Sequence, residues 1–398
     1  MATKIFPPTP LRLWHALCLL IFLAAFGYAA FLGFTRPYHN WDMLAYVGSA
    51  ISWSEPDTQR LYDKAMTDVN SVVGPEHYKN MSTSILSNNP ESFRQQLPFY
   101  TVKPLYVALV FALHRMGSTY GAATWHISVF SFLALGLVLA LWRSRLDYGV
   151  WLLAIVVLSC LGEWPMLSLA RFSTPDALAT TLIMAALFFL LKRRSLAAFI
   201  GIGAASILAR PDALVLLVLA SAFVYCAREE QGRFTLKQTT LAIAIFVAVY
   251  VTVQVAAGGY GWTKLFYYTF IEKLSRPAET SVHLTPATYV EVLRWGVRNI
   301  LSDVRLMPML VLSMLAVFCH FMRPAAGRVW PWVLALAWIS YGVRIALFPA
   351  WWEYRYYYVN YLIALTAIAE MTPPYVLARW QWLRARWSRL NPNPHPAK

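Results

Sequence analysis

The feature of this sequence that most constrains its fold is a run of 22 residues, 13–34, that is apolar apart from His15. A helix rises about 1.5 Å per residue, so the run is long enough to cross a bilayer core about 30 Å thick. No small-residue cleavage site follows it, as one follows a signal peptide. The run therefore predicts an uncleaved first transmembrane helix.

The composition extends this prediction to the whole chain. Of its 398 residues, 59% are hydrophobic and 13% are charged, whereas soluble domains carry about 25% charged residues. A water-soluble core cannot absorb so much apolar surface, because long chains divide into domains with water between them. A lipid-facing exterior can, so we predict an all-α polytopic membrane protein.

The net charge of +15 does not by itself point to nucleic acid. The basic residues are spread over short connections between apolar runs, where Lys and Arg gather on the inner side of membrane proteins. All four cysteines lie within apolar runs, so no disulfide framework is expected. We expect membrane lipids, and no nucleic acid, as partners of the chain.

The short basic connections predict the orientation. Basic clusters at 143–145 and 192–194 and a basic stretch at 379–389 separate or follow apolar runs, and the positive-inside bias places them in the cytoplasm. The segments 35–118 and 258–305 are then outer loops. The runs predict ten spans, near 13–34, 119–142, 148–165, 174–191, 195–209, 212–227, 239–257, 306–322, 329–348 and 356–378.

These spans predict one membrane module, residues 1–379, followed by a cytoplasmic basic tail, 380–398. Both termini are expected in the cytoplasm. We expect a multi-pass protein of the bacterial inner (plasma) membrane, with any active site facing the periplasm or exterior.

One apolar run, 103–117, is too short for an ordinary crossing. If it crossed, the basic clusters would move to the opposite side, so we predict a re-entrant or surface-lying helix with both ends outside. Lys103 precedes Pro104, which suits the first turn of a helix. A lysine at a helix N-terminus near the bilayer surface is a natural anion site.

Four acids stand at the predicted outer ends of spans: Asp42, Asp176, Asp212 and Glu353. Asp176 and Asp212 follow prolines in "STPDALATTL" and "ARPDALVLLVL", a pattern typical of a helix start. An aspartate there interacts favourably with the helix dipole and bonds free backbone N–H groups, and this explanation is preferred for Asp212. For Asp176, with Arg171 nearby, a functional role stays equally open.

Asp42 carries no such proline or cap signal. It lies a few residues after the first span and before the amphipathic segment "MLAYVGSAISW". A solvated loop acid is the simpler explanation. An acid beside Trp41 and Tyr46 at the membrane surface also loses part of its hydration, a condition found at active sites.

The tip "FPAWWEYRYYYVNY" is rich in aromatic residues, as membrane interfaces are, but that belt does not explain Arg355. Arginine binds phosphate through its planar fork, so Lys103, Arg171 and Arg355 are candidates to hold a phosphate. Snorkelling to lipid headgroups is the alternative for both arginines. The histidines show no metal-ligand spacing, and no nucleotide-binding motif is present, so neither metal nor nucleotide is predicted.

Taken in order, these features resemble the GT-C superfamily of membrane glycosyltransferases. The resemblance rests on Asp42 after the first span, the "KPLY" helix, "R-x4-D-A-L" at 171–178, a second "RPDAL" and the late "EYRY" tip. It is closest to the aminoarabinose-transferase and protein-mannosyltransferase branch. That branch often has an acidic pair where Met43 follows Asp42, and many members have a large outer C-terminal domain. These departures leave the acceptor open.

The resemblance implies a GT-C-like bundle of about ten transmembrane helices that transfers a sugar, with inversion, from a polyprenyl-phosphate donor to a hydroxyl of a lipid, glycan or protein. Asp42 would be the catalytic base. Lys103, Arg355 and Arg171 would bind the donor phosphate, and Asp176, Glu353 and His39 would orient the substrates. No cofactor is implied, and a divalent metal has no support in the sequence. The loop 258–305, with Tyr267, Tyr268 and His283, is expected to close over the site.

Other functions stay open. A flippase or transporter of lipid-linked sugars places charges and broken helices near the bilayer midplane, whereas the acids here lie at span ends, which favours the enzyme. A polymerase or ligase of surface polysaccharide differs only in its acceptor. A non-catalytic scaffold leaves the outward gathering of Asp42, Lys103 and Arg355 unexplained.

The orientation can be tested with single cysteines. We predict that residues 60–100 and 265–300 lie outside, and that 192–194 and the C-terminal tail lie inside. In intact cells, a membrane-impermeant thiol reagent should label Ser84→Cys and leave Ser195→Cys unlabelled. Labelling of Ser195→Cys but not of Ser84→Cys would overturn the topology.

Overall fold

The computed structural model describes residues 9–74, 89–142, 165–227, 235–302, 306–322, 329–350 and 353–371. Within these ranges the chain is almost entirely helical, and its one strand-like contact is an isolated bridge between Tyr38 and Phe172. The helices are α1 (Thr9–Thr35), α2 (Asp42–Ile51), α3 (Thr58–Val73), α5 (Pro90–Gln96), α6 (Pro98–Thr101), α7 (Pro104–Arg115), α8 (Tyr120–Leu141), α10 (Pro165–Arg171), α11 (Asp176–Phe188), η2 (Phe189–Arg193), α12 (Leu196–Ala209), α13 (Ala213–Cys226), α15 (Leu236–Ala256), α16 (Gly261–Phe270), α17 (Pro286–Leu301), α18 (Leu306–Met322), α19 (Val329–Leu347), η3 (Tyr354–Tyr356) and α20 (Tyr358–Met371).

Several of these helices are able to cross a membrane. Four are long and apolar enough by themselves, and the number rises to six if two bent helix pairs each count as one span. The four are Ala16–Thr35, Tyr120–Leu141, Leu236–Ala256 and Val329–Leu347. The prediction of an all-α membrane protein is confirmed at this level.

The finer count of ten spans stays a prediction. The runs at 195–209, 212–227 and 356–378 contain apolar helices of only 14 residues each, α12, α13 and α20. The run 148–165 lies almost wholly outside the described residues, as do the cluster at 143–145 and everything after residue 371.

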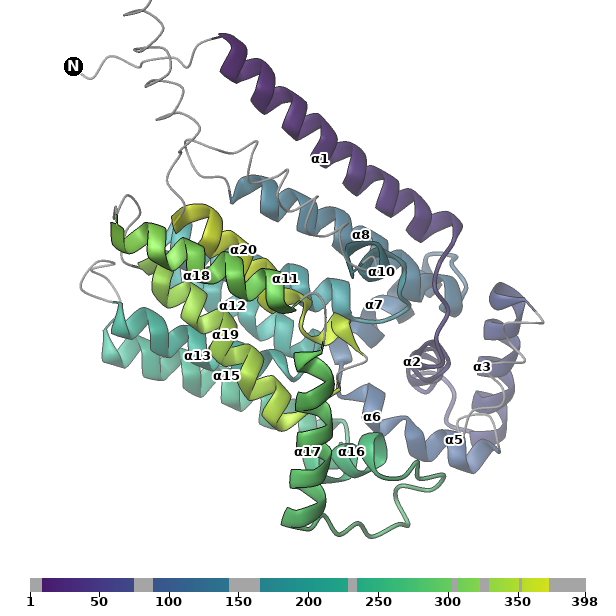
Figure 1. Cartoon of the computed structure of the whole chain (residues 1–398). Coiled ribbons are helices and arrows are strands. Elements are labelled where there is room, and N and C mark those ends of the chain that lie inside the picture. Colours follow the sequence, from purple (N-terminus) through teal and green to yellow (C-terminus); the bar gives the residue numbers. More distant parts are fainter. Residues whose placement is uncertain are drawn as a thin grey trace, which may run out of the picture.

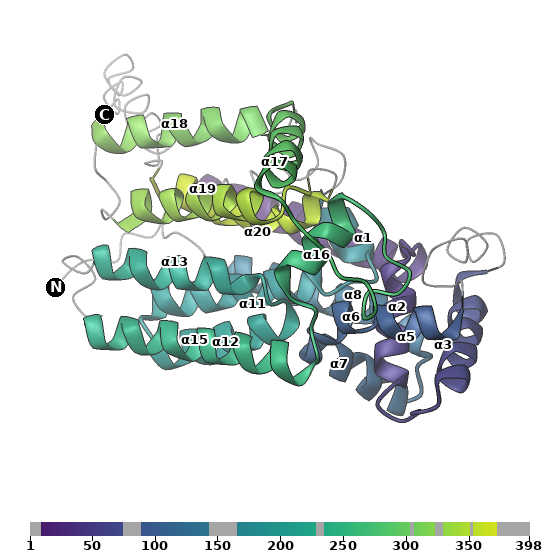
Figure 2. The same cartoon turned by 90° about the horizontal axis from the view of Figure 1, so that it is seen from below.

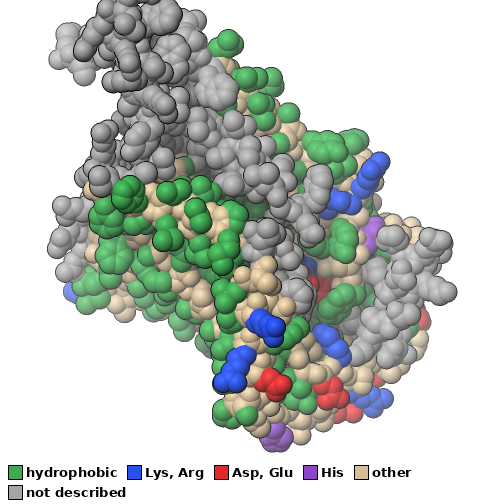
Figure 3. Space-filling view, in the orientation of Figure 1, with side chains coloured by type: hydrophobic (Ala, Val, Ile, Leu, Met, Phe, Trp, Pro, Cys, Tyr) green, Lys and Arg blue, Asp and Glu red, His purple; other side chains and the backbone are tan. Residues whose placement is uncertain are grey.

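The long helices form a bundle (Figures 1 and 2), and its interior is apolar. On α1, Phe22 and Phe26 are buried, and the ring of Phe26 stacks on Phe132 of α8 with centroids 4.6 Å apart. The opposite face of α1 exposes Leu20 and Leu23. Exposed apolar faces of this size mark contact with lipid or a partner, and Figure 3 shows hydrophobic side chains over the bundle and charged ones near α16 and α17.

A second group of helices, α2, α3, α5, α6 and α7, gathers at one end of the bundle (Figures 1 and 2). Every residue of α2 is buried. Its Gly48 lies against Phe93 of α5, and a Cβ there would come within 2.3 Å of the Phe93 ring. Asp68 of α3 accepts hydrogen bonds from the backbone N–H groups of Tyr120 and Gly121, and so ties this group to the start of α8.

The short helix predicted from residue 103 is present as α7. It begins at Pro104, with Lys103 as its N-cap residue, and it lies at 112° to the helical segment Pro90–Thr101 before it. Whether α7 re-enters the membrane or lies on its surface stays a prediction. Lys103 lies at this bend, in the break between the two helical segments.

Candidate functional site

The two groups of helices enclose a cavity of about 770 Å³. Its wall includes side chains from α2, α6, α11, α13, α15, α16 and α19, and from the segments that join these helices. Among the lining residues are four carboxylates, Asp42, Asp176, Asp212 and Glu353, and five basic groups, Lys103, Arg210, Lys273, Arg344 and Arg355. Charged side chains are therefore concentrated around this cavity, although only 13% of the residues in the chain are charged.

Asp42 is the first residue of α2 and is only 8% exposed. Its Oδ2 accepts hydrogen bonds from Arg355 Nη2 at 2.8 Å and from Asn40 Nδ2 at 3.2 Å. Its Oδ1 accepts one from the Tyr100 hydroxyl at 3.2 Å. A carboxylate in the first turn of a helix is also favoured by the helix dipole, so Asp42 is held in a defined orientation and is not a solvated loop acid.

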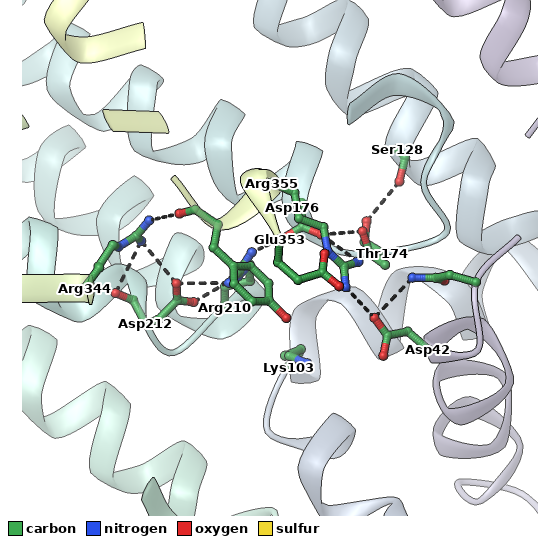
Figure 4. A network of polar contacts seen from close by, with 12 residues as sticks. Asp42, Lys103, Ser128, Thr174, Asp176, Arg210, Asp212, Arg344, Glu353 and Arg355 are labelled. Atoms are coloured by element: carbon green, nitrogen blue, oxygen red, sulfur yellow. Dashed lines mark hydrogen bonds and ion pairs between the residues drawn. The ribbon is translucent and has the colours of Figure 1, made fainter. Parts of the chain in front are cut away.

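Arg355 contacts three carboxylates at once (Figure 4). Its Nε donates to Glu353 at 2.7 Å, its Nη2 donates to Asp42 at 2.8 Å, and its Nη1 lies 3.4 Å from Asp176. The side chain is 7% exposed. A planar fork with several donors suits this task.

The pairing continues through Arg210 (Figure 4). Arg210 forms an ion pair with Asp176 and binds Asp212 through two nitrogens, at 2.9 and 3.1 Å. Nη2 of Arg344, on α19, lies 3.2 Å from Asp212 Oδ2, which also accepts from Arg210. We call this alternating set of Asp42, Glu353, Arg355, Asp176, Arg210, Asp212 and Arg344 the charge ladder.

The helix-capping explanation of Asp212 is wrong in its detail. Asp212 is the N-cap residue of α13, but its side chain makes no capping hydrogen bond. Two guanidinium groups take its oxygens instead. The pairing with Arg344 could not be predicted from the local sequence, because Arg344 lies 132 positions from Asp212.

Lys103 has a different environment. Its Nζ donates to the Tyr46 hydroxyl at 2.7 Å and lies 4.9 and 5.0 Å from the ring centroids of Tyr46 and Tyr100. Among the described residues no carboxylate lies within ion-pair distance of it. Burial lowers the pKa of Lys103 to about 8, although the field of Asp42 acts to raise it. An anion entering the cavity would meet this ammonium without displacing a carboxylate.

Part of the cavity wall is apolar. Leu214 and Val215 of α13, Leu265 of α16 and Leu347 of α19 line it, together with Tyr250 of α15. A hydrocarbon chain is compatible with this wall, which adjoins the charge ladder, because α13 carries Leu214 and Val215 just after Asp212 and α19 carries both Arg344 and Leu347. The cavity thus suits a ligand that is both charged and apolar.

The structure brings together five of the seven predicted site residues: Asp42, Lys103, Asp176, Glu353 and Arg355 all line the cavity. Arg171 and His39 do not line it. The Nε of Arg171 donates to the Arg36 carbonyl at 2.6 Å, which holds α10 beside the end of α1. His39 packs edge-on against Trp125.

Of the three residues named in the loop 258–305, which was expected to close over the site, only one lines the cavity. Tyr268 lines the cavity, whereas Tyr267 and His283 do not; the Tyr267 hydroxyl donates to Glu272 at 3.3 Å. Among the described residues, no three His, Cys, Asp or Glu side chains gather so that they could hold a metal ion.

Sequence reasoning overlooked Arg210, Arg344, Tyr46, Tyr100 and Lys273 as site residues. For the two arginines a signal existed, since each interrupts an apolar stretch near its predicted outer end. For the tyrosines and Lys273 no local signal existed, because aromatic and basic residues are common in outer loops.

Comparison of this chain with protein-family models, with curated proteins and with solved structures finds no match.

The charge ladder should dominate the stability of this end of the bundle. Arg210→Met removes one partner of the buried Asp176 and one of the partly exposed Asp212, and breaking a buried ion pair costs about 3–5 kcal/mol. We expect a clear fall in the midpoint of thermal unfolding in detergent. Arg276→Met, in the exposed pair between Arg276 and Glu279, is the control and should leave the midpoint unchanged. Equal midpoints for the two variants would contradict the ladder's role.

Proposed function

We propose that this protein is an inverting glycosyltransferase that moves a sugar from a polyprenyl-phosphate donor to an acceptor hydroxyl. The observation that carries the proposal is one cavity in which an oriented carboxylate, Asp42, lies near Lys103, an ammonium with no carboxylate partner among the described residues. The apolar wall of the same cavity suits a polyprenyl chain.

The proposed arrangement has ten spans, both termini in the cytoplasm and the cavity at the outer face of a bacterial inner membrane. Support comes from the basic cluster at 192–194, at the opposite end of α11 from Asp176. An outer compartment lacks nucleotide sugars, so a lipid-linked sugar is the reasonable donor there. The acceptor is a lipid, a glycan or a protein.

The reaction needs few groups. As the acceptor oxygen bonds to the anomeric carbon, the bond from that carbon to the donor phosphate breaks, and the electron pair leaves with the polyprenyl phosphate. Because that phosphate is stable as an anion, no general acid is required. Asp42 takes the proton of the acceptor hydroxyl during attack from the opposite face. Lys103 stabilises the charge that builds up on the phosphate.

Arg355 was expected to bind the donor phosphate directly. It is already engaged by three carboxylates, so binding a phosphate would require it to give up at least one of them. We therefore assign it first to holding Asp42 in position, with Glu353 and Asp176 holding Arg355 in turn. Lys103 has no such competition.

The base can be tested by Asp42→Asn, which keeps the shape and removes the basicity. A positioned general base contributes about 10²–10⁴-fold, so single-turnover transfer from a polyprenyl-phosphate sugar should fall by that factor while donor binding persists. Asp176→Asn, in the same ladder, is the comparison and should cost less. Near-normal transfer by Asp42→Asn would remove it as the base, and normal transfer by both variants would favour a transporter.

The phosphate contact predicts a pH dependence. The donor is a phosphodiester with no ionisation near neutral pH, and Lys103 binds it best as the ammonium. Since the pKa of Lys103 is about 8, donor affinity should be constant below that pH and should fall as pH rises through it. Lys103→Ala should bind about one to two decades more weakly at neutral pH and lack this step.

Lys103→Arg is the control, because its guanidinium stays charged across the whole range. It should keep the affinity at high pH that the wild type loses. The measurement is donor affinity by titration calorimetry in detergent from pH 6 to pH 10. Identical pH profiles for the wild type and Lys103→Ala would refute the contact.

A further inference from the structure

We propose that Lys273 is a second ligand of the donor phosphate, and that α5 holds the segment that carries it in place; this inference rests on the proposed function. Lys273 lies between α16 and α17, in the outer loop that was expected to close over the site. It lines the same cavity as Asp42 and Lys103.

The side chain of Lys273 lies at the edge of the cavity, against aromatic rings. Its Nζ is 4.4 Å from the ring centroid of Tyr268 and 5.5 Å from that of Trp41, the residue before Asp42. Within the described ranges no carboxylate lies within ion-pair distance of it. Partial burial lowers its pKa, and the field of Asp42 acts in the opposite direction.

The pairing of the other charged groups in the cavity leaves Lys103 and Lys273 available to bind an anion. The four carboxylates all pair with guanidinium groups of the ladder, whereas Lys103 and Lys273 contact aromatic rings. The field of Asp42 reaches both of them. A phosphodiester has two free oxygens, and one ammonium can bind each as a point charge.

The segment that carries Lys273 is fixed to α5 by hydrogen bonds from buried side chains. Gln96 Nε2 donates to the Leu274 carbonyl at 2.5 Å, and Ser92 Oγ donates to the Ser275 carbonyl at 2.6 Å. Both donors are fully buried, and Leu274 is 5% exposed. The backbone on the C-terminal side of Lys273 is therefore positioned before any ligand arrives.

Gln95 adds two contacts from the exposed side of α5. Its Nε2 donates to Glu279 at 2.7 Å, and its Oε1 accepts from the Ala278 N–H at 3.2 Å. A ligand group that is already in place costs less entropy to engage. The outer loop is thus a fixed edge of the site in this structure, with Lys273 at its rim.

The test measures the contribution of the phosphate alone. Purified full-length chain in detergent is titrated with farnesyl phosphate and with farnesol, its neutral counterpart, and the ratio of the two affinities is the readout. Lys273→Met should lower this ratio about three- to tenfold, as expected for the loss of one partly exposed charged contact. Lys273→Arg should retain most of it.

Two further variants separate the residue from its segment. Arg276→Met, in the same segment and paired with Glu279, is the control and should keep the wild-type ratio. Gln96→Leu should lower the ratio in the wild-type chain but have no further effect in Lys273→Met, as a double-mutant cycle detects.

The outcomes distinguish this inference from the proposed function. A wild type that binds both probes equally would overturn the lipid-phosphate donor, and Lys273 with it. A wild type that prefers farnesyl phosphate, with an unchanged ratio in Lys273→Met, would overturn Lys273 and leave the proposed function standing. An effect of Gln96→Leu that persists in Lys273→Met would overturn the positioning role of α5.

Discussion

The arrangement of this cavity depends on the pairing of buried and partly buried carboxylates with guanidinium groups that are themselves largely buried. Desolvating a charge is costly, and the attraction of an ion pair repays that cost only with good geometry and further hydrogen bonds. The charge ladder meets this condition by alternation: Arg355 joins Asp42 to Asp176, Arg210 joins Asp176 to Asp212, and Arg344 closes the far end. It thereby fixes the ends of α2, α11, α13 and α19 relative to one another.

This arrangement separates the charges that hold the structure from those that are available to a ligand. The arginines of the ladder have carboxylate partners, whereas Lys103 and Lys273 contact tyrosine and tryptophan rings. Aromatic faces attract a cation without neutralising it. The lysines therefore keep their charge for an incoming anion, and Asp42 lies near enough for its field to act on both.

The two groups of helices contribute differently to the site. The bundle supplies most of the apolar wall and most of the ladder, through the ends of α11, α13 and α19. The smaller group supplies Asp42, Tyr100 and Lys103, and its α5 anchors the segment that carries Lys273. A ligand with an apolar chain and an anionic head could contact both groups at once, which is the physical basis for preferring a lipid-linked donor.

The sequence by itself determined the membrane character, the helical class and the short helix after Lys103, because apolar length and proline position are local properties. It also indicated that Asp42, Lys103, Asp176, Glu353 and Arg355 share one side. Only the tertiary structure decided their partners. Arg355 could not be assigned to carboxylates from the sequence, since Asp42 lies 313 positions away, and Arg171 has the same chemistry but contacts a backbone carbonyl. Local patterns predict helices, whereas the pairing of charges depends on which helix ends meet.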